Sequence, residues 1–290
     1  MCIDAAHCEL WVRDWPPVPV PPPPLALLMG IQSQDCAENP NWCRANQAEI
    51  PTCDRALLMS DALAHGPNGT ALHFNGLRIL RAAIVKLAAL GLNKAERVVL
   101  TGFVHGGTAV FLHADRIGRW LRQLAPSLRV YKALPADGFH PKHNSVEFFP
   151  AAFPDNQTDV YSTVLQGVAN VSNASAGMTA ACKARHVGVE WNCLYVNETL
   201  ADIVTPTFAV QQQASIFDTQ CNIAAEVIAM SAGRDAILMV QCIAGRGQWH
   251  ICFQYSERCS AAQLTGVVAP FQQQYVGGRL YTRRLSHATW

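Results

Sequence analysis

The residues with the clearest chemical potential are three glycines that follow a short apolar run. Val98–Leu100 is apolar and rich in β-branched side chains, which is typical of a buried parallel strand. Gly102, Gly106 and Gly107 then fit a sharp strand-to-helix turn, where a Cβ would collide with the next element. A turn of the pattern Gly-x-Ser-x-Gly presents a nucleophilic serine for acyl transfer. Here Val104 occupies the serine position.

An acid and a base at the ends of later strands would complete this chemistry. In α/β hydrolases the three catalytic residues follow the chain order Ser, Asp, His. The apolar stretch Ile203–Gln211 predicts a buried strand and leads to Asp218, in the position of the acid. Another predicted strand, Ala236–Ile243, leads to Gly245, in the position of the histidine. The chain therefore offers three ordered positions, and the first and third lack the required side chains.

Helix and strand patterns alternate around these positions. In chain order the sequence predicts a long amphipathic helix, a strand, a helix and a strand, over Ala71–Leu92, Val98–Gly102, Gly107–Leu124 and Leu128–Ala133. This order implies a βαβ unit with a right-handed crossover. We therefore expect an α/β fold, α/β-hydrolase-like, with a mostly parallel sheet flanked by helices. The weaker pattern over 138–181 predicts loops and short helices.

The length and composition fit one large α/β domain. The chain has 290 residues, of which 50% are hydrophobic and 15% charged, so it can bury a substantial core. We expect a single domain over residues 1–290. The proline-rich stretch 14–25 must be extended, and we interpret it as a surface insertion or spacer, with a ligand for an aromatic groove as the alternative. The pattern is weak over 251–290.

Charge and hydropathy exclude some partners. The net charge of +1 gives no electrostatic case for binding nucleic acid or an anionic membrane. No apolar run reaches the length of a membrane-spanning helix, so we predict no transmembrane segment. The first residues of the sequence lack the basic and apolar regions of a signal peptide.

The cysteines and glycosylation sequons point to a secreted protein. The 11 cysteines are irregularly spaced and lack the paired C-x-x-C units of zinc sites, so we predict neither a metal nor a cofactor. Disulfides with one cysteine left over are the preferred interpretation, and buried free thiols in a cytosolic protein are the alternative. Asn-x-Ser/Thr sequons occur at Asn68, Asn156, Asn170, Asn173 and Asn197. A secretory protein whose signal peptide is absent from this sequence explains both features.

Several dispersed segments resemble the pectin acetylesterase/Notum family of secreted carboxylesterases. Leu100–Gly107 is similar to the family's elbow, Leu-Thr-Gly-Cys-Ser-Ala-Gly-Gly, and Leu112–Asp115 to its His-x-Asp segment. Further similar segments are Asn39–Trp42, Cys53–Asp54, Leu72–Arg78, Ala136–Phe139, Thr205–Phe208 and Gln241–Gly245. The resemblance implies an α/β-hydrolase fold, serine-type hydrolysis of acetyl esters on pectin-like polysaccharide, and a secreted or cell-wall location.

The departures from the family fall on its catalytic positions. Val104 has no hydroxyl with which to form an acyl-enzyme, and Gly245 cannot act as a general base. Asp218 is retained at the acid position, and the main-chain N–H groups of His105 and Gly106 are the candidate oxyanion donors. The family's Gly-Gly-Trp-Cys segment has no counterpart in this sequence, so the resemblance implies that one or more N-terminal strands are missing.

The sequence therefore predicts a non-catalytic member of this family. Its partner would be an acetylated polysaccharide, another acylated glycan, or a protein bound in the former catalytic cleft. Two alternatives stay open. The protein is an active acetylesterase if the sequence comes from a truncated or faulty gene model. It is a drifted fragment without a stable fold if the missing strand leaves a sheet edge exposed.

Overall fold

The computed structural model describes residues 4–14, 34–37, 39, 42–52, 54, 56–136, 138–139, 160–212 and 238–240. The chain divides into two compact units. The first unit comprises Met1–Val18 and Ile50–Pro206, and the second comprises Pro19–Glu49 and Thr207–Trp290. Most of the described helices and strands belong to the first unit.

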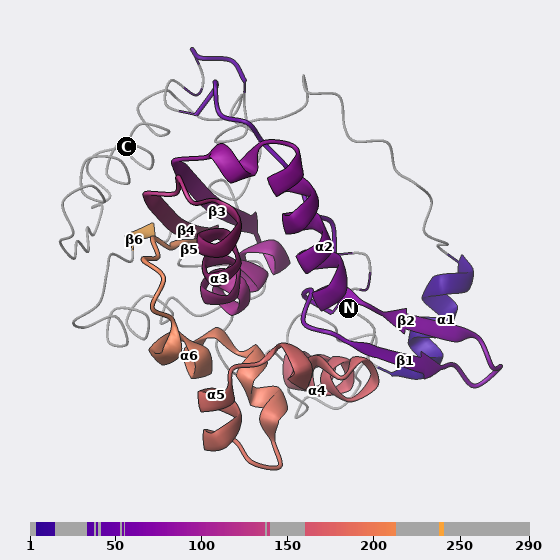
Figure 1. The fold of residues 1–290 in the computed structure, drawn as a ribbon. Coiled ribbons are helices and arrows are strands. Elements are labelled where there is room, and N and C mark those ends of the chain that lie inside the picture. The colour runs from indigo at the N-terminus through magenta and orange to yellow at the C-terminus, as the bar shows by residue number, and fades with distance from the viewer. Residues whose placement is uncertain are drawn as a thin grey trace. The chain divides into compact units, whose positions relative to one another are not determined.

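The first unit contains, in chain order, the elements α1 (Ala5–Asp14), β1 (Ala62–His65), β2 (Ala71–Phe74), α2 (Gly76–Ala89), η3 (Leu92–Lys94), β3 (Arg97–Phe103), α3 (His105–Leu124), β4 (Val130–Ala136), α4 (Val160–Ser172), η4 (Ala174–Gly177), α5 (Ala180–Arg185), η5 (Glu190–Leu194), α6 (Val196–Thr199) and η6 (Leu200–Asp202) (Figure 1). The described strands of the second unit are β5 (Val210–Gln212) and β6 (Leu238–Val240).

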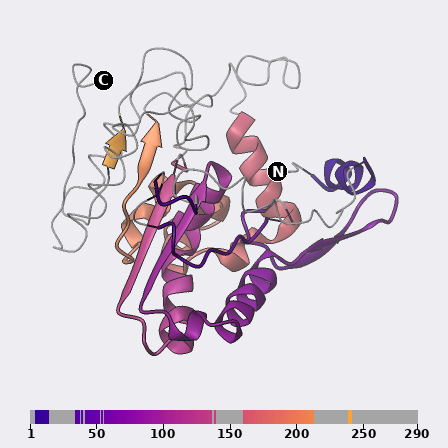
Figure 2. The same cartoon turned by 90° about the horizontal axis from the view of Figure 1, so that it is seen from above.

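The centre of the first unit is the β3–α3–β4 segment, which confirms the predicted βαβ unit. β3 and β4 pair in parallel, in a register that runs from Arg97 opposite Val130 to Phe103 opposite Ala136. α3 contacts both strands and also packs against α2 (Figure 2). Its buried face includes Val110, Ala114, Ile117 and Leu121, which recur at the three- and four-residue spacing of an amphipathic helix.

The predicted helix over Ala71–Leu92 is wrong at its N-terminal end. Residues 71–74 form β2, which pairs antiparallel with β1, and only Gly76–Ala89 is α-helical. Burial alternates along β2, with Leu72 and Phe74 inside, so this stretch has the period of a strand. The helix begins where the main-chain N–H of Gly76 donates to the buried Ser60 hydroxyl, at 3.1 Å.

The predicted strand over Ile203–Gln211 is also wrong over most of its length. Only its last two residues are assigned to a strand, as the start of β5 (Val210–Gln212), apart from an isolated bridge at residue 207. The reason lies in a side chain distant in sequence, because the Asp115 carboxylate accepts hydrogen bonds from the main-chain N–H groups of Val204 and Thr205, the latter at 2.7 Å. Pro206, next along the chain, has no N–H to donate to a ladder.

In the second unit, β5 and β6 pair in parallel from Val210 opposite Leu238 to Gln212 opposite Val240. β6 lies inside the strand predicted over 236–243. The segment 34–54 contains the disulfide Cys36–Cys43. Residues 15–25 and 251–290 lie outside the described residues, so the insertion and the single-domain organisation stay predictions.

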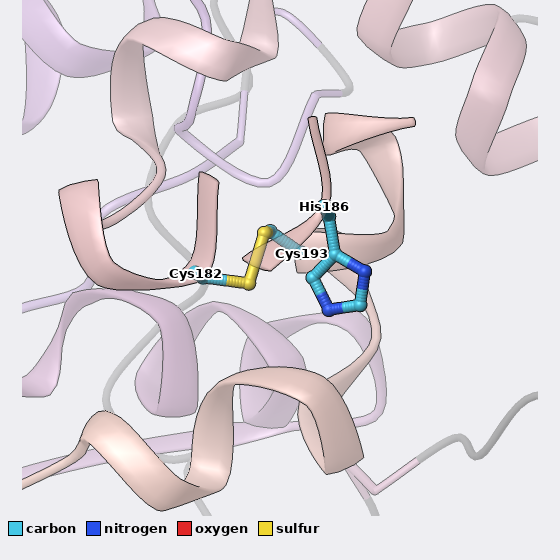
Figure 3. Close-up of side chains that lie close together, drawn as sticks. All are labelled: Cys182, His186 and Cys193. Carbon is cyan, nitrogen blue, oxygen red and sulfur yellow. A yellow bond between two sulfur atoms is a disulfide. The ribbon is translucent and has the colours of Figure 1, made fainter. Parts of the chain in front are cut away.

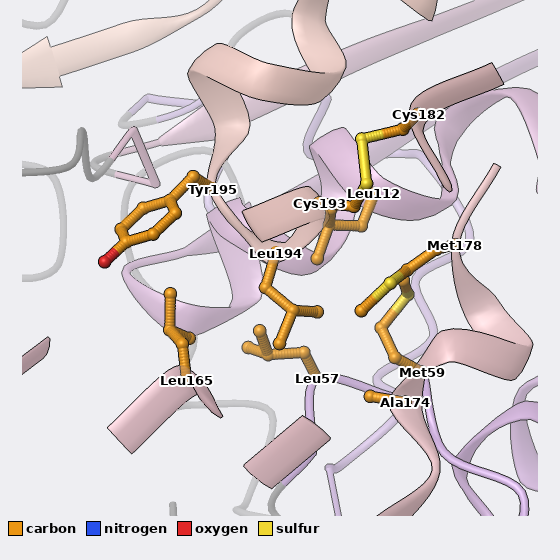
Figure 4. Packing of buried hydrophobic residues seen from close by; sticks show 10 residues of the cluster. All are labelled: Leu57, Met59, Leu112, Leu165, Ala174, Met178, Cys182, Cys193, Leu194 and Tyr195. Carbon is orange, nitrogen blue, oxygen red and sulfur yellow. A yellow bond between two sulfur atoms is a disulfide. The ribbon is translucent and has the colours of Figure 1, made fainter. Parts of the chain in front are cut away.

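One apolar cluster of the first unit brings six described segments together (Figure 4). Its buried members are Leu57, Met59, Leu112, Leu165, Ala174, Met178, Cys182, Cys193, Leu194 and Tyr195. Part of the cluster comes from α4, a helix of 13 residues in a region for which the sequence predicts only loops and short helices. The disulfide Cys182–Cys193 lies within this cluster and joins α5 to η5.

A buried histidine on α3, His113, binds a left-handed turn that contributes Leu57 to this cluster. Leu57 and Leu58 have φ angles of 56° and 58°, which are unusual for residues other than glycine. Nε2 of His113 lies 2.9 Å from the Leu57 carbonyl oxygen, and an Arg116 guanidinium nitrogen lies 3.0 Å from Nδ1 of His113. Because arginine only donates, His113 accepts at Nδ1 and donates from Nε2 in its neutral form.

We predict that His113 makes the fold sensitive to acid. Burial, together with Arg116, lowers the pKa of His113 to about 3 in the folded protein, while an unfolded chain has a histidine pKa of about 6.5. Between these values only the unfolded state takes up the proton, so stability falls as pH falls. The loss from pH 6.5 to 4.5 should be roughly 2 kcal/mol.

The measurement is denaturant unfolding from pH 7.5 to 4.5 for the parent, His113→Gln and His73→Gln. His73 is an exposed histidine on β2 and serves as the matched control. His113→Gln should be less stable at pH 7.5 but should show a flatter pH dependence than the other two. Three parallel pH profiles would contradict the assignment.

A strained strand-to-helix elbow as the candidate active site

Val104 is the single residue between β3 and α3, and its backbone is strained. Its φ and ψ angles are 52° and −115°, in the mirror-image extended region that glycine adopts readily and a β-branched residue very rarely. The main-chain N–H of Val104 donates to the Ala136 carbonyl at 3.0 Å, and its carbonyl accepts from the N–H of Thr108 at 3.0 Å. The neighbouring strand and the following helix therefore both hold the turn.

The glycines around Val104 allow three backbone segments to meet. A Cβ on Gly102 would clash with the carbonyl group of Gly106, and one on Gly107 would lie 2.5 Å from the Ala136 oxygen and 2.8 Å from Cα of Gly138. The Thr108 hydroxyl donates to the Gly138 carbonyl at 2.9 Å and joins the same segments. The first turn of α3 thus packs directly on the ends of β3 and β4, as the glycine spacing predicts.

The chemistry of this elbow resides in its main chain. His105 and Gly106 lie in the first turn of a 20-residue helix, where N–H groups lack intrahelical acceptors and the helix dipole favours negative charge. Such groups can bind the oxygen of a polarised carbonyl. The Val104 side chain, half-buried at the apex, carries only methyl groups and cannot attack a carbonyl carbon.

The structure places only part of the predicted site. Val104, His105 and Gly106 are consecutive at the elbow, in the arrangement expected for a nucleophile position followed by oxyanion donors. Asp218 and Gly245 lie outside the described residues. Their roles as the retained acid position and the lost histidine position therefore stay predictions.

The sequon at Asn68 lies near the tip of the β1–β2 hairpin and is bound by a buried carboxylate from α1. Glu9, 6% exposed, accepts hydrogen bonds from the main-chain N–H of Asn68 at 3.1 Å and from its side-chain amide at 3.2 Å. The Thr70 hydroxyl, also part of the sequon, donates to Glu9 as well. Both functional groups of this sequon are thus engaged within the fold.

The other described sequons differ in accessibility. Asn170 and Asn173 are exposed, on α4 and just after it, whereas Asn197 is half-buried beside the buried Thr199. Asn156 lies outside the described residues. Glycosylation at all five positions remains a prediction.

The sequence did not predict the role of Asp115, nor the convergence of two cysteines and a histidine near α5. Asp115 holds the 204–205 segment through its carboxylate, which also accepts from the Thr205 hydroxyl at 2.6 Å. Only the resemblance drew attention to it, and no local pattern connects it with residues 89 positions away. Cys182, His186 and Cys193 converge on one point although their spacing matches no common metal motif.

Comparison with known proteins gives a consistent family. The family model for pectinacetylesterase matches residues 24–278. The chain is 26% identical over 191 residues to pectin acetylesterase 5 of Arabidopsis thaliana, covering 66% of this chain and 41% of that protein. It is 28% identical over 221 residues to the palmitoleoyl-protein carboxylesterase notum1' of Xenopus laevis, covering 72% and 42% respectively. The chain therefore spans about two-fifths of the length of these relatives.

A solved structure has a similar fold. The Wnt deacylase Notum from Drosophila superposes with a TM-score of 0.61 and 18% sequence identity, covering 89% of this chain and 82% of that one. At this identity the likeness shows the fold alone. It confirms the α/β-hydrolase-like class predicted from the alternating pattern and the elbow.

The strain at Val104 predicts an unusually small effect of Val104→Gly. Glycine relieves a backbone conformation that costs about 1–3 kcal/mol, which offsets the loss of side-chain contacts and the greater entropy of the unfolded chain. Val99→Gly in β3 is the matched control, since Val99 is also a half-buried valine but lies in a regular strand. Denaturant unfolding should show Val104→Gly less destabilising than Val99→Gly by about 2 kcal/mol. Equal losses of unfolding free energy in the two variants would show that the backbone at Val104 is not strained.

A second pair of variants tests the close backbone packing. Gly107→Ala should destabilise the protein by about 3 kcal/mol, because its Cβ meets backbone atoms that have no room to move. Gly106→Ala is the matched control one residue earlier, where the added Cβ would meet no heavy atom within 4 Å apart from its chain neighbours and the adjacent backbone of its own helix. It should be neutral, or stabilising by up to about 1 kcal/mol through helix propensity. The measurement is thermal unfolding of both variants. Equal unfolding temperatures would contradict the close backbone packing at Gly107.

Proposed function

The chain belongs to the pectinacetylesterase family, and on this premise we propose that it is a non-catalytic relative of the family's carboxylesterases. The observation that carries the proposal is Val104, which adopts the strained elbow conformation at the position where the reaction needs a hydroxyl. The elbow conformation supports the assignment of residue 104 to the nucleophile position, rather than to a chance similarity in a short motif.

Ester hydrolysis through an acyl-enzyme needs two groups that residues 104 and 245 do not supply. A hydroxyl oxygen must attack the ester carbonyl while a base removes its proton, and residues 104 and 245 are valine and glycine. In a serine hydrolase, loss of the nucleophile or the base alone lowers kcat by about 10⁶, and loss of the second adds little. Asp218, the retained acid position, then has no imidazole to orient.

An acylated glycan is the ligand that the remaining elbow supports best. Binding a carbonyl oxygen requires the main-chain N–H groups of His105 and Gly106, and these depend on backbone geometry rather than on a serine. The Val104 methyl groups offer an apolar contact for a short acyl chain such as acetyl. We therefore propose that the protein binds acetylated pectin-like polysaccharide without cleaving it.

The cysteines support a secreted or cell-wall location. The described part of the chain contains the disulfides Cys36–Cys43 and Cys182–Cys193, and Cys8 is also disulfide-bonded. Disulfides are typical of proteins that mature in an oxidising compartment. Among the described helices, none combines the length and apolar character needed to cross a membrane.

The function is tested by restoring the missing groups. The unmodified protein should show no saturable turnover of p-nitrophenyl acetate or acetylated pectin. Val104→Ser and Gly245→His should each remain inactive, since nucleophile and base act as a unit. The double variant V104S/G245H should hydrolyse p-nitrophenyl acetate at least tenfold faster than either single variant, if both positions are assigned correctly.

Val85→Ser combined with Gly245→His is the matched control, because Val85 is an exposed valine on α2 remote from the elbow in sequence. This control should gain no turnover of p-nitrophenyl acetate. Turnover by the unmodified protein that a substitution at the elbow abolishes would overturn the non-catalytic assignment. The ligand is tested separately by titration with acetylated and de-esterified pectin fragments, of which only the acetylated form should bind.

A further inference from the structure

Three metal-ligating side chains converge at the junction of α5 and η5, in a part of the molecule that the proposed function does not use. Cys182 lies on α5, His186 directly follows that helix, and Cys193 lies in η5. One ligand atom from each lies within 4.8 Å of the other two. Figure 3 shows the His186 imidazole beside the two sulfur atoms, which are joined as a disulfide.

We propose that the reduced form of this protein binds one Zn²⁺ ion through Cys182, His186 and Cys193. Zinc prefers a tetrahedral set of sulfur and nitrogen ligands, with Zn–S of about 2.3 Å and Zn–N of about 2.0 Å. These lengths place two sulfur ligands about 3.8 Å apart and require no larger separation between sulfur and nitrogen. Once the S–S bond is broken, the two sulfurs need only a small movement to reach such a geometry.

In the proposed site Glu198, which is not one of the three converging residues, turns to supply the fourth ligand. Its carboxylate oxygen Oε2 lies 3.1 Å from Nε2 of His186, close to the separation of about 3.4 Å between nitrogen and oxygen ligands on one zinc ion. The Glu198 side chain is 32% exposed, so it can turn toward the metal. Arg185 donates to the main-chain carbonyl of Glu198 at 2.8 Å, and its own charge is paired with Asp202 at 2.7 Å.

Burial favours metal over free thiolates at this position. Cys182 and Cys193 are both wholly buried, and two unpaired thiolates there would be strongly destabilised. Two thiolates, the Glu198 carboxylate and one Zn²⁺ sum to a charge of −1, so the metal offsets most of this penalty. The same three residues thus offer two alternative cross-links between α5 and η5, a disulfide when oxidised and a zinc ion when reduced.

Reduction of the disulfide precedes metal binding. A dithiol reductant transfers two electrons and two protons to the Cys182–Cys193 bond, yields two thiols and becomes a cyclic disulfide itself. Zn²⁺ then displaces both thiol protons, which pass to solvent. Oxidation reverses the sequence and expels the metal, so zinc occupancy reports the redox state of this cysteine pair.

The test uses the full chain, reduced under argon with a water-soluble phosphine that is then removed. Native mass spectrometry with one equivalent of Zn²⁺ should show one ion per chain, and Co²⁺ should give the thiolate-to-metal absorption of a tetrahedral site. His186→Ala keeps all 11 cysteines and should bind at least tenfold more weakly. Glu198→Gln should weaken binding to a smaller extent, and His65→Ala, on the β1–β2 hairpin, should not change it.

Oxidised His186→Ala keeps the disulfide, so an unfolding midpoint equal to that of the oxidised parent confirms that it folds. Zinc should also raise the unfolding midpoint of the reduced parent but not that of reduced His186→Ala. Two results would overturn the proposal. One is a reduced parent that binds no zinc, and the other is equal zinc binding by reduced His186→Ala, which would point to nonspecific capture by the many thiols.

Discussion

The first unit depends on one steric constraint, the absence of Cβ atoms where the first turn of α3 meets the ends of β3 and β4. Gly102, Gly107 and Gly138 bring three backbones to distances that no other residue allows. This contact sets the direction in which α3 leaves the strand, and it makes Val104 adopt a conformation suited to glycine. The parallel register of β3 with β4 and the packing of α3 on both strands follow from the same junction.

α3 also organises its surroundings through polar side chains that all bind main-chain groups. His113 binds the Leu57 carbonyl, Arg116 binds the Gly177 carbonyl at 2.5 Å, and Asp115 binds the N–H groups of Val204 and Thr205. The His-x-Asp segment therefore has a sufficient structural role here. Residue types that catalyse reactions elsewhere serve in this helix to fix three irregular segments around it.

The sequence was sufficient for those features that depend on local pattern. The apolar run before Gly102, the glycine spacing and the periodicity of α3 predicted the βαβ unit and placed Val104 at its turn. The errors came from interactions between residues distant in sequence. Leu72 fitted a helix, but pairing with β1 places it in a strand, and the main-chain N–H groups of residues 204 and 205 bind Asp115 instead of a neighbouring strand. The convergence of Cys182, His186 and Cys193 was equally invisible, because it is set by how α5 and η5 pack.

The bond between Glu9 and the hairpin tip has a consequence for how this chain tolerates change. The carboxylate of α1 binds residues about 60 positions later, and Cys8 and Trp11 pack with Leu72 and Phe74 in the same cluster. α1 is therefore retained by its own side chains and does not depend on the covalent connection that follows it. Lengthening that connection adds only a slowly growing loop entropy, about 0.6 kcal/mol for each doubling. A longer connection between α1 and β1, where the sequence predicts a proline-rich insertion over 14–25, is thus the kind of divergence that the fold accommodates easily.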